Sequence, residues 1–319
     1  MRLNLALGAG LVAAMLLSLL VGQIWVSPGD WLGGDLPSLI ITQLRLPRIC
    51  AGALIGAALG MSGAAMQGYL RNPLADPGLF GISACAALGA VASMFLGLAG
   101  GWWLLPLFAL CGAMAGAALL AVIAGRSGSI ILFTLAGVML SSLAAALTAL
   151  LINLAPTPFA SSEIVTWLMG ALTDRSWNDV LLAAPLVAGG LVLLLRTGPS
   201  LDALTLGDVA ARSLGLDMAR LQLLIVGGLG LAVGSSVAIA GVIGFVGLMV
   251  PHLMRPLTGH RPSALLLPSA LGGALLVVLA DMVVRAVPST SEIRLGVMMS
   301  VLGAPFFLAL LLRMRRELA

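Results

Sequence analysis

The sequence predicts an all-α, polytopic membrane protein with about ten transmembrane helices per subunit. Hydrophobic residues make up 61% of the 319 residues and charged residues only 9%, against roughly 25% in an average soluble domain. The mean hydropathy is +1.14, and long intervals, such as that between Arg48 and Arg71, hold no charged residue. These observations exclude a soluble globular protein and a disordered chain. Three scattered cysteines also exclude a disulfide scaffold.

The charge-free intervals provide ten candidate spans, since a transmembrane helix needs about 20 apolar residues. The first is interpreted as a retained span and not as a signal peptide, because its apolar run exceeds the roughly 7–15 residues of a signal-peptide core. The eighth is too short to cross a bilayer comfortably. We expect the chain, 1–319, to form a single transmembrane domain. The segments are 5–25, 49–70, 79–98, 103–124, 131–154, 180–196, 221–242, 244–256, 263–286 and 295–312.

The arginines predict the orientation of these spans. All sixteen basic residues are arginines, and arginine is enriched in cytoplasmic loops. An even number of spans with both termini in the cytoplasm places eleven arginines inside and five outside. The inner set is Arg2, Arg71, Arg126, Arg196, Arg212, Arg220, Arg255, Arg261, Arg313, Arg315 and Arg316, and the outer set is Arg45, Arg48, Arg175, Arg285 and Arg294.

Glycines at four-residue intervals predict close helix packing in the second span. Gly52, Gly56 and Gly60 share one helical face, which Gly63 and Ala64 continue. Small residues at this spacing let helices approach closely in lipid, where burial alone does not drive association.

Signatures of chemistry are sparse. The chain has no lysine, so it lacks the phosphate-binding loop of an ATPase. His252 and His260 have no cysteine or paired carboxylates nearby, which argues against a metal site. The arginines are spread singly, which argues against nucleic-acid binding. We expect no catalytic, cofactor or metal site on this chain.

Few ionisable residues fall within the spans. Asp281 is the candidate, and Arg285 lies four residues further on, so the two are expected to pair on one helical face. Ion-coupled transporters place carboxylates or histidines at mid-membrane. A lone ion- or proton-coupled secondary transporter is therefore kept as the alternative function, while an intramembrane enzyme lacks the paired aspartates, serine–histidine pair or metal triad that it would need.

The longest polar stretch on the inner side predicts a short amphipathic helix within 200–217. Asp208 suits a helix N-terminus and Gly215 a C-terminal stop. The apolar stripe needs a partner surface, either the protein's own bundle or a separate soluble subunit. The stripe consists of Leu206, Val209, Ala210 and Leu214.

Several motifs, in a fixed order along nearly the whole chain, resemble one family. The sequence is similar to the iron-siderophore, heme and vitamin B12 uptake permeases, which are the membrane subunits of type II ATP-binding-cassette importers. The matching motifs are Leu-Arg-Leu-Pro-Arg at 44–48, Gly-Ala-Ala-Met-Gln-Gly at 63–68, Arg-Asn-Pro-Leu-Ala-Asp-Pro-Gly at 71–78, Leu-Gly-Asp-Val-Ala-Ala-Arg-Ser-Leu-Gly at 206–215, 241–255, Ala-Asp-Met-Val-Val-Arg at 280–285 and Leu-Gly-Ala-Pro-Phe at 302–306.

The resemblance implies ten helices per subunit in the bacterial inner membrane and a second permease subunit, with a homodimer favoured. It implies two ATPase subunits that carry the ATP and Mg²⁺, and a periplasmic substrate-binding protein. The implied function is ATP-driven import of a bulky metal chelate by alternating access. Ferric siderophore ranks first, because it is the commonest substrate in the family, followed by heme or cobalamin.

The resemblance also implies residue roles. The outer Arg45, Arg48 and Arg285 are expected to dock acidic residues of the binding protein, since a guanidinium pairs with a carboxylate at two points. The expected ATPase-coupling residues are Gly207, Asp208, Ala211, Arg212, Leu214 and Gly215. The expected cytoplasmic gate is Asn72, Leu74, Ser129 and Ile130. Ser141, Ser142 and Thr148 in the fifth span are suggested to face the path.

Overall fold

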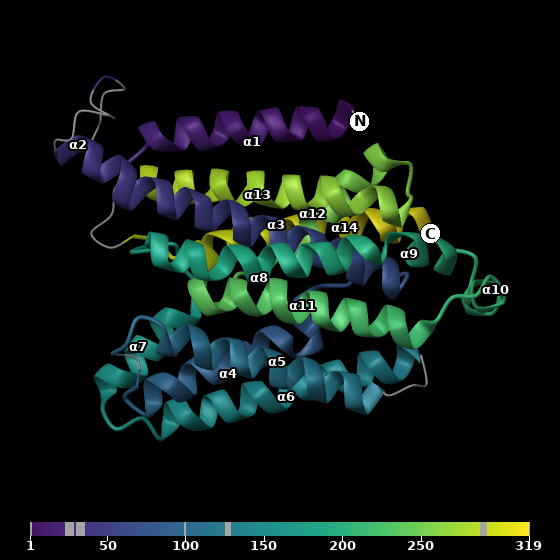
Figure 1. Ribbon diagram of the computed structural model, residues 1–319, viewed down its shortest axis with the longest axis horizontal. Coiled ribbons are helices and arrows are strands. Elements are labelled where there is room, and N and C mark those ends of the chain that lie inside the picture. Colours follow the sequence, from purple (N-terminus) through teal and green to yellow (C-terminus); the bar gives the residue numbers. More distant parts are fainter. Residues whose placement is uncertain are drawn as a thin grey trace.

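The computed structural model describes residues 2–22, 29, 36–98, 100–124, 129–287 and 292–318. All regular elements assigned within these ranges are helices, and most run along the long axis of the molecule (Figure 1). They are α1 (Arg2–Leu20), α2 (Leu36–Leu39), the π-helix η2 (Ile40–Arg45), α3 (Leu46–Tyr69), the 3-10 helix η3 (Pro77–Phe80), α4 (Ile82–Phe95), α5 (Leu104–Ala124), α6 (Ile130–Asn153), α7 (Pro158–Leu168), α8 (Trp177–Arg196), α9 (Gly198–Leu204), α10 (Asp208–Ser213), α11 (Met218–Ala240), α12 (Val246–Met254), the 3-10 helix η5 (Arg255–Thr258), α13 (Pro262–Ala286) and α14 (Leu295–Leu318).

Each of the ten predicted spans corresponds to a helix of the structure. Eight helical stretches of the described chain are long and apolar enough to cross a membrane. The other two predicted spans correspond to α4, with 14 residues, and α12, with 9 residues. The end of the predicted first span, 23–25, and the predicted inner Arg126 lie outside the described residues.

The structure has helix in two places where the sequence analysis expected none. α2 and η2 continue directly into α3, so that this helical stretch begins at Leu36, 13 residues before 49. α7 occupies the stretch that we expected to be an outer loop. Thr157 accepts a hydrogen bond from the Ala160 N–H at 3.1 Å, and Pro158 is the first helical residue. Threonine at the N-cap followed by proline is a helix-start signal that the sequence contains.

The predicted small face of α3 packs against α13, as the glycine spacing indicated. A Cβ atom on Gly56 would lie 2.2 Å from the carbonyl oxygen of Gly273, and one on Gly60 would lie 2.1 Å from that of Ser269. No side chain fits into either gap, so the two backbones are in direct contact. This close approach makes α3 and α13 a tightly packed central pair.

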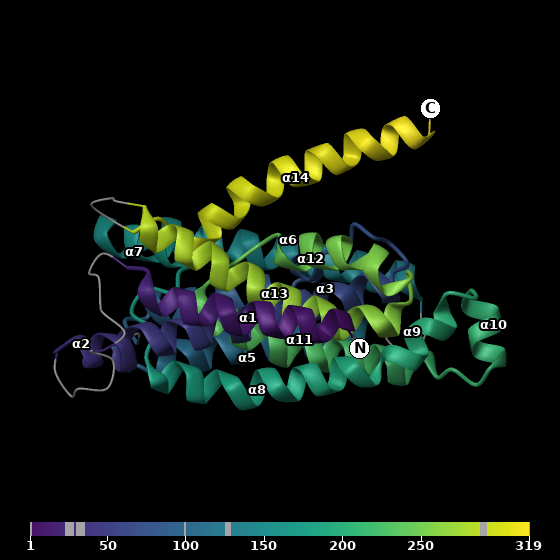
Figure 2. The same ribbon diagram turned by 90° about the horizontal axis from the view of Figure 1, so that it is seen from above.

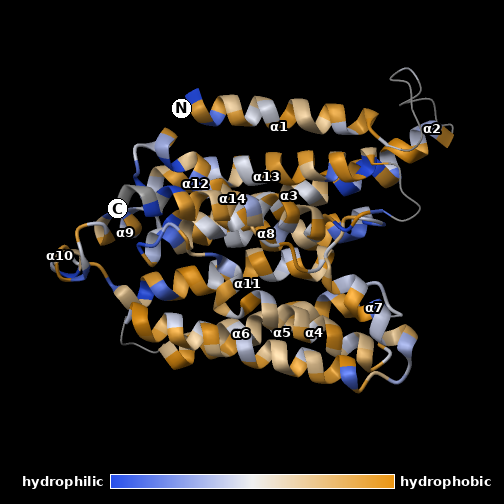
Figure 3. Cartoon of the chain, turned by 180° about the vertical axis from the view of Figure 1, so that it is seen from behind, coloured by the Kyte–Doolittle hydropathy of each residue, from blue (hydrophilic) through white to orange (hydrophobic). Residues whose placement is uncertain are grey.

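Polar residues gather at the two ends of the bundle (Figure 3). The start of α1, the end of α14 and the α9–α10 segment lie at one end, and α2 and α7 lie at the other (Figure 1). Seen from above, α14 diverges from the bundle toward its C-terminus (Figure 2). We call the α9–α10 end the inner end and the opposite one the outer end.

Candidate functional site

The α9–α10 segment consists of an anchored helix followed by a projecting one. Leu201 and Leu204 of α9 are fully buried against the bundle. The Asp202 carboxylate accepts hydrogen bonds from the Ser263 N–H at 2.8 Å and from the Ser263 hydroxyl at 2.6 Å, at the start of α13. α9 is therefore fixed to α13, and α10 is attached to a rigid base.

α10 carries its apolar residues on its surface. Val209 is 82% exposed, Leu214 68% and Leu206 64%, whereas Ala211 is buried. The apolar stripe predicted from the sequence is thus present, and these three side chains do not use the protein's own bundle as their partner. The ATPase-coupling role of Gly207, Asp208, Ala211, Arg212, Leu214 and Gly215 stays a prediction.

The predicted start and stop of this helix are both found. Asp208 is the first residue of α10, and Gly215 follows its end with φ of 87°. Gly207 at the N-cap has φ of 94°, a conformation that L-residues with side chains rarely adopt. Two positive-φ glycines therefore delimit α10, with the exposed Arg212 between them.

An ion pair links α10 to the predicted gate. Arg71, directly after α3, pairs with Asp208 at 2.8 Å. Next to it, the Asn72 side chain accepts a hydrogen bond from the Leu74 N–H at 2.9 Å and so closes a turn within the loop. The Ser129 hydroxyl caps α6, accepting from the Leu132 N–H.

The two segments that carry the predicted gate residues, 72–74 and 129–130, are each close in sequence to an aromatic residue, and these rings are in contact. Tyr69 at the end of α3 lies edge-on to Phe133 in the first turn of α6, with 5.2 Å between ring centroids. Phe80 of η3 stacks on the other side at 5.5 Å. The gate role of Asn72, Leu74, Ser129 and Ile130 remains a prediction.

Two interruptions of helical structure meet inside the bundle. The Ser141 hydroxyl, midway along α6, donates to the Leu79 carbonyl at 3.1 Å, so the loop after α3 returns into the bundle before α4 begins. On the other side, α12 begins only after the non-helical residues 241–245. Gly247 at its start is in contact with Pro77. Irregular backbone at such depth is tolerated where protein covers it or where it lines a cavity.

A cavity of about 380 Å³ lies at this meeting point. Its walls come from the loop at 76–78, from α6 and from residues 242–247, and they include Asp76 and Thr148. Asp76 accepts a hydrogen bond from the Gly78 N–H at 2.7 Å and forms no ion pair with any described residue. Of the three hydroxyl residues suggested for the path, Thr148 lines this cavity. The hydroxyls of all three donate hydrogen bonds to backbone carbonyls.

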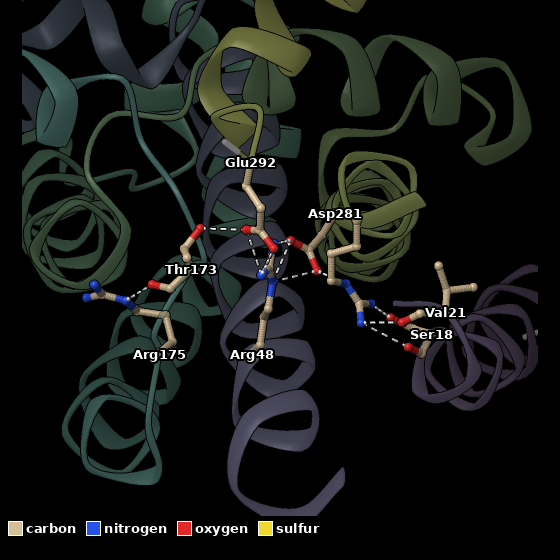
Figure 4. A network of polar contacts seen from close by, with 8 residues as sticks. Ser18, Val21, Arg48, Thr173, Arg175, Asp281 and Glu292 are labelled. Carbon is tan, nitrogen blue, oxygen red and sulfur yellow. Dashed lines mark hydrogen bonds and ion pairs between the residues drawn. The ribbon is translucent and has the colours of Figure 1, made fainter. Parts of the chain in front are cut away.

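At the outer end, Arg48 forms the centre of a charge network (Figure 4). Its Nε and Nη2 donate to Asp281, the shortest contact being 2.8 Å, and its Nη1 donates to both carboxylate oxygens of Glu292, at 3.1 and 2.9 Å. Asp281 also pairs with Arg285 at 3.0 Å, which confirms the pairing predicted from their spacing. One carboxylate is thus shared by two arginines.

Arg285 and Arg45 donate to backbone carbonyls at the end of α1. Arg285 donates to the carbonyls of Ser18, in the last turn of α1, and of Val21, and to the Ser18 hydroxyl. Arg45 donates to the Leu19 carbonyl. The network therefore fastens α1, α3 and α13 together at one end.

The three predicted docking arginines converge on one hollow of about 290 Å³. Arg45, Arg48 and Arg285 all line it, and they are only 6%, 9% and 7% exposed. Their guanidinium groups are already hydrogen-bonded within the chain. The docking role stays a prediction, and a docking carboxylate would have to compete with these internal partners.

Glu292 belongs to this site, although no role was assigned to it in the sequence analysis. It lies in the short non-helical stretch before α14 and also accepts a hydrogen bond from Thr173 at 2.8 Å. Partial burial would raise the pKa of its carboxyl, but the neighbouring Arg48 and the Thr173 hydroxyl outweigh burial and hold the pKa below its ordinary value. Its partner Arg48 is 244 residues away in sequence, so no local spacing could have indicated the pair.

Comparisons with known proteins place this arrangement in a family. Residues 10–313 match the FecCD transport family. The chain is 41% identical to the vitamin B12 import system permease protein BtuC of Salmonella paratyphi A, over 99% of this chain and 96% of that protein. It is 40% identical to the BtuC protein of Salmonella typhimurium, with the same coverage.

Solved structures agree with the fold. A metal-chelate type ABC transporter in an inward-facing conformation superposes with a TM-score of 0.87 at 32% identity, over 97% of this chain and 98% of that chain. PsaBC from Streptococcus pneumoniae superposes with a TM-score of 0.54 at 19% identity, over 88% and 92% of the two chains, and this likeness concerns the fold alone. The chain belongs to the FecCD transport family and is a multi-pass inner-membrane permease subunit of an ATP-binding-cassette importer.

Proposed function

We propose that the chain is one half of a permease homodimer that moves vitamin B12, or a closely related corrinoid, from a periplasmic binding protein to the cytoplasm. Transport follows alternating access, and ATP is hydrolysed on two separate ATPase subunits at the inner end. The observation that carries the proposal is the exposed apolar stripe of α10. An apolar surface on a short helix with a rigid base is suited to fit into a groove of a partner.

The substrate assignment is supported by similarity along the full chain. The relatives that share 40–41% of their residues with it over 99% of its length are vitamin B12 import permeases. Ferric siderophore was ranked first only because it is the commonest substrate in the family, and no residue of this chain supports that ranking. We therefore place the corrinoid before the siderophore and heme.

Uptake by whole cells tests the substrate. A strain lacking its own vitamin B12 permease is complemented with this chain and the ATPase subunit of the same transporter. The accumulation of labelled cyanocobalamin is then compared with that of a labelled ferric siderophore and of heme. We expect cyanocobalamin accumulation alone to be restored. Restored siderophore or heme uptake without cyanocobalamin uptake would reverse the ranking.

The coupling role of α10 is tested by Leu214→Asp. The substitution places a charge in the exposed stripe, where a groove of the ATPase would desolvate it, so we expect substrate-stimulated ATP hydrolysis and uptake to fall roughly tenfold or more. Leu257→Asp is the matched control, because Leu257 is 61% exposed and lies in η5, outside α10. The thermal stability of the purified permease should be the same in both variants, since both leucines are on the surface.

Unchanged stimulation and uptake in Leu214→Asp would remove the coupling assignment. An equal loss in Leu214→Asp and Leu257→Asp would show that α10 has no special part in binding the ATPase. The homodimer is tested by the mass of the purified complex in nanodiscs, which should contain two copies of this chain and two ATPase subunits.

A further inference from the structure

The two carboxylates that neutralise Arg48 are held very differently. Asp281 lies within α13, its side chain is 3% exposed, and it accepts hydrogen bonds from Arg48 and forms an ion pair with Arg285. The side chain of Glu292 is 26% exposed. Within the described chain it is held by Arg48 and by the Thr173 hydroxyl.

This difference makes Asp281 a permanent partner of Arg48 and Glu292 a replaceable one. Removing Asp281 would leave two buried guanidinium groups facing each other, which is strongly unfavourable. Glu292 can leave Arg48 for water, because it is partly solvated and its segment is not helical. Only the Arg48 Nη1 donor would then need a new acceptor.

The position of Arg48 indicates where the new acceptor would come from. Arg48 and Glu292 both line the outer hollow, together with Arg45, Arg175 and Arg285. Four arginines and two acidic residues, Asp174 and Glu292, thus surround one opening. Asp281 pairs with Arg48 and Arg285, and Asp179 pairs with Arg175, so the charges around the hollow are largely offset. A carboxylate entering from outside therefore binds by reaching the face of Arg48 that Glu292 occupies, not by a general excess of positive charge.

We propose that Glu292 is an exchangeable internal counter-ion, which neutralises Arg48 until a carboxylate of the docking substrate-binding protein takes its place. This inference rests on the docking role of Arg48 in the proposed function. It assigns Glu292 as a residue that weakens docking and sets the release of the binding protein, because every docking event must first displace it.

The exchange has a direct consequence for α14. Glu292 is three residues from Leu295, where α14 begins, and the Gly296 N–H donates to the Gly170 carbonyl at 3.1 Å. Releasing Glu292 from Arg48 and Thr173 removes the two side-chain bonds that it forms at the start of α14. Docking on the outside would in this way loosen the attachment of the helix that diverges from the bundle (Figure 2).

The experiment measures docking affinity on the complete transporter. The permease and its ATPase are reconstituted in nanodiscs, and the Kd for the substrate-binding protein of the same transporter is measured in the absence of nucleotide. Glu292→Gln should bind roughly tenfold more tightly than the wild type, which corresponds to about 1.4 kcal/mol. Thr173→Val removes one support of Glu292 without changing any charge, and it should bind roughly twofold more tightly.

Glu163→Gln is the matched control. Glu163 is exposed on α7 at the same end and forms no ion pair with a described residue, so its removal changes the general potential but not Arg48. We expect no change in Kd for this variant. A gain in affinity also excludes misfolding as the cause, since a damaged permease would bind more weakly.

The outcomes separate this inference from the proposed function. If Glu292→Gln binds no more tightly while Arg48→Ala loses docking, the docking role stands and the exchange is wrong. An equal gain in Glu163→Gln and Glu292→Gln would replace the exchange by general electrostatics. If the Arg48→Ala permease assembles with its ATPase and binds the substrate-binding protein as the wild type does, the docking role of Arg48 is wrong, and the proposed exchange is wrong with it.

Discussion

Asp281→Asn tests the outer network at its centre. Asp281 accepts hydrogen bonds from the Nε and Nη2 of Arg48, at 3.0 and 2.8 Å, and pairs with Arg285 at 3.0 Å. The three side chains are 3%, 11% and 6% exposed. Removing the charge leaves two buried cations, for which Glu292 is the remaining carboxylate in the network. Breaking a buried pair in this way costs about 3–5 kcal/mol.

The assay is equilibrium unfolding of the purified permease in mixed detergent and lipid micelles. Glu163→Gln serves as the control and should change the free energy of unfolding by less than about 0.5 kcal/mol, as exposed substitutions do. Adding Arg285→Met to Asp281→Asn should cost less than the sum of the two single substitutions, because it removes one uncompensated cation. A loss below about 1 kcal/mol for Asp281→Asn, or strict additivity in the double variant, would refute the reasoning.

Two further predictions concern packing and pH. Gly56→Val should prevent folding or strongly lower the yield of folded permease, because a Cβ there would lie 2.2 Å from the Gly273 carbonyl oxygen. Gly8→Val is the control and should be tolerated, because the space around Gly8 is open. Size-exclusion profiles of the two variants check this. The lowered pKa of Glu292 means that its ionised form stabilises the folded state above the ordinary value of 4.5, and that this contribution is lost as the pH falls through the lower folded value. The difference in unfolding free energy between wild type and Glu292→Gln should therefore be constant at neutral pH and shrink in acid, and a difference that grows in acid would contradict the sign.

Hydropathy predicted the membrane spans because lipid imposes the same requirement on every spanning helix. The ten apolar segments matched ten helices, and the spacing of Asp281 and Arg285 predicted their pair. The α10 helix was predicted from its start, stop and stripe. Its exposure was not, because a stripe shows that a partner is needed without showing which partner.

The remaining features depend on contacts between distant parts of the chain. Arg48 meets Glu292, and Arg255 donates to Gln67 across 188 residues. The return of the loop after α3 into the bundle, and with it the cavity beside Asp76, depends on how the half-length helices α4 and α12 pack. Hydropathy identifies these stretches as apolar but does not show where their backbone stops being helical.

The two ends of the transporter are joined by the α3–α13 pair. α3 is about 36 Å long, with Arg48 in its first turn and Arg71 just beyond its last. α13 is fixed to α9 at its inner end through Ser263 and carries Asp281 at its outer end. Direct backbone contact along the pair prevents α3 from sliding past α13 unless the helices separate. If α10 binds the ATPase as proposed, we expect the α3–α13 pair to carry its movement to the outer network as a rigid body. The side-chain contacts that would break first are Arg71–Asp208 at the inner end and Arg48–Glu292 at the outer end.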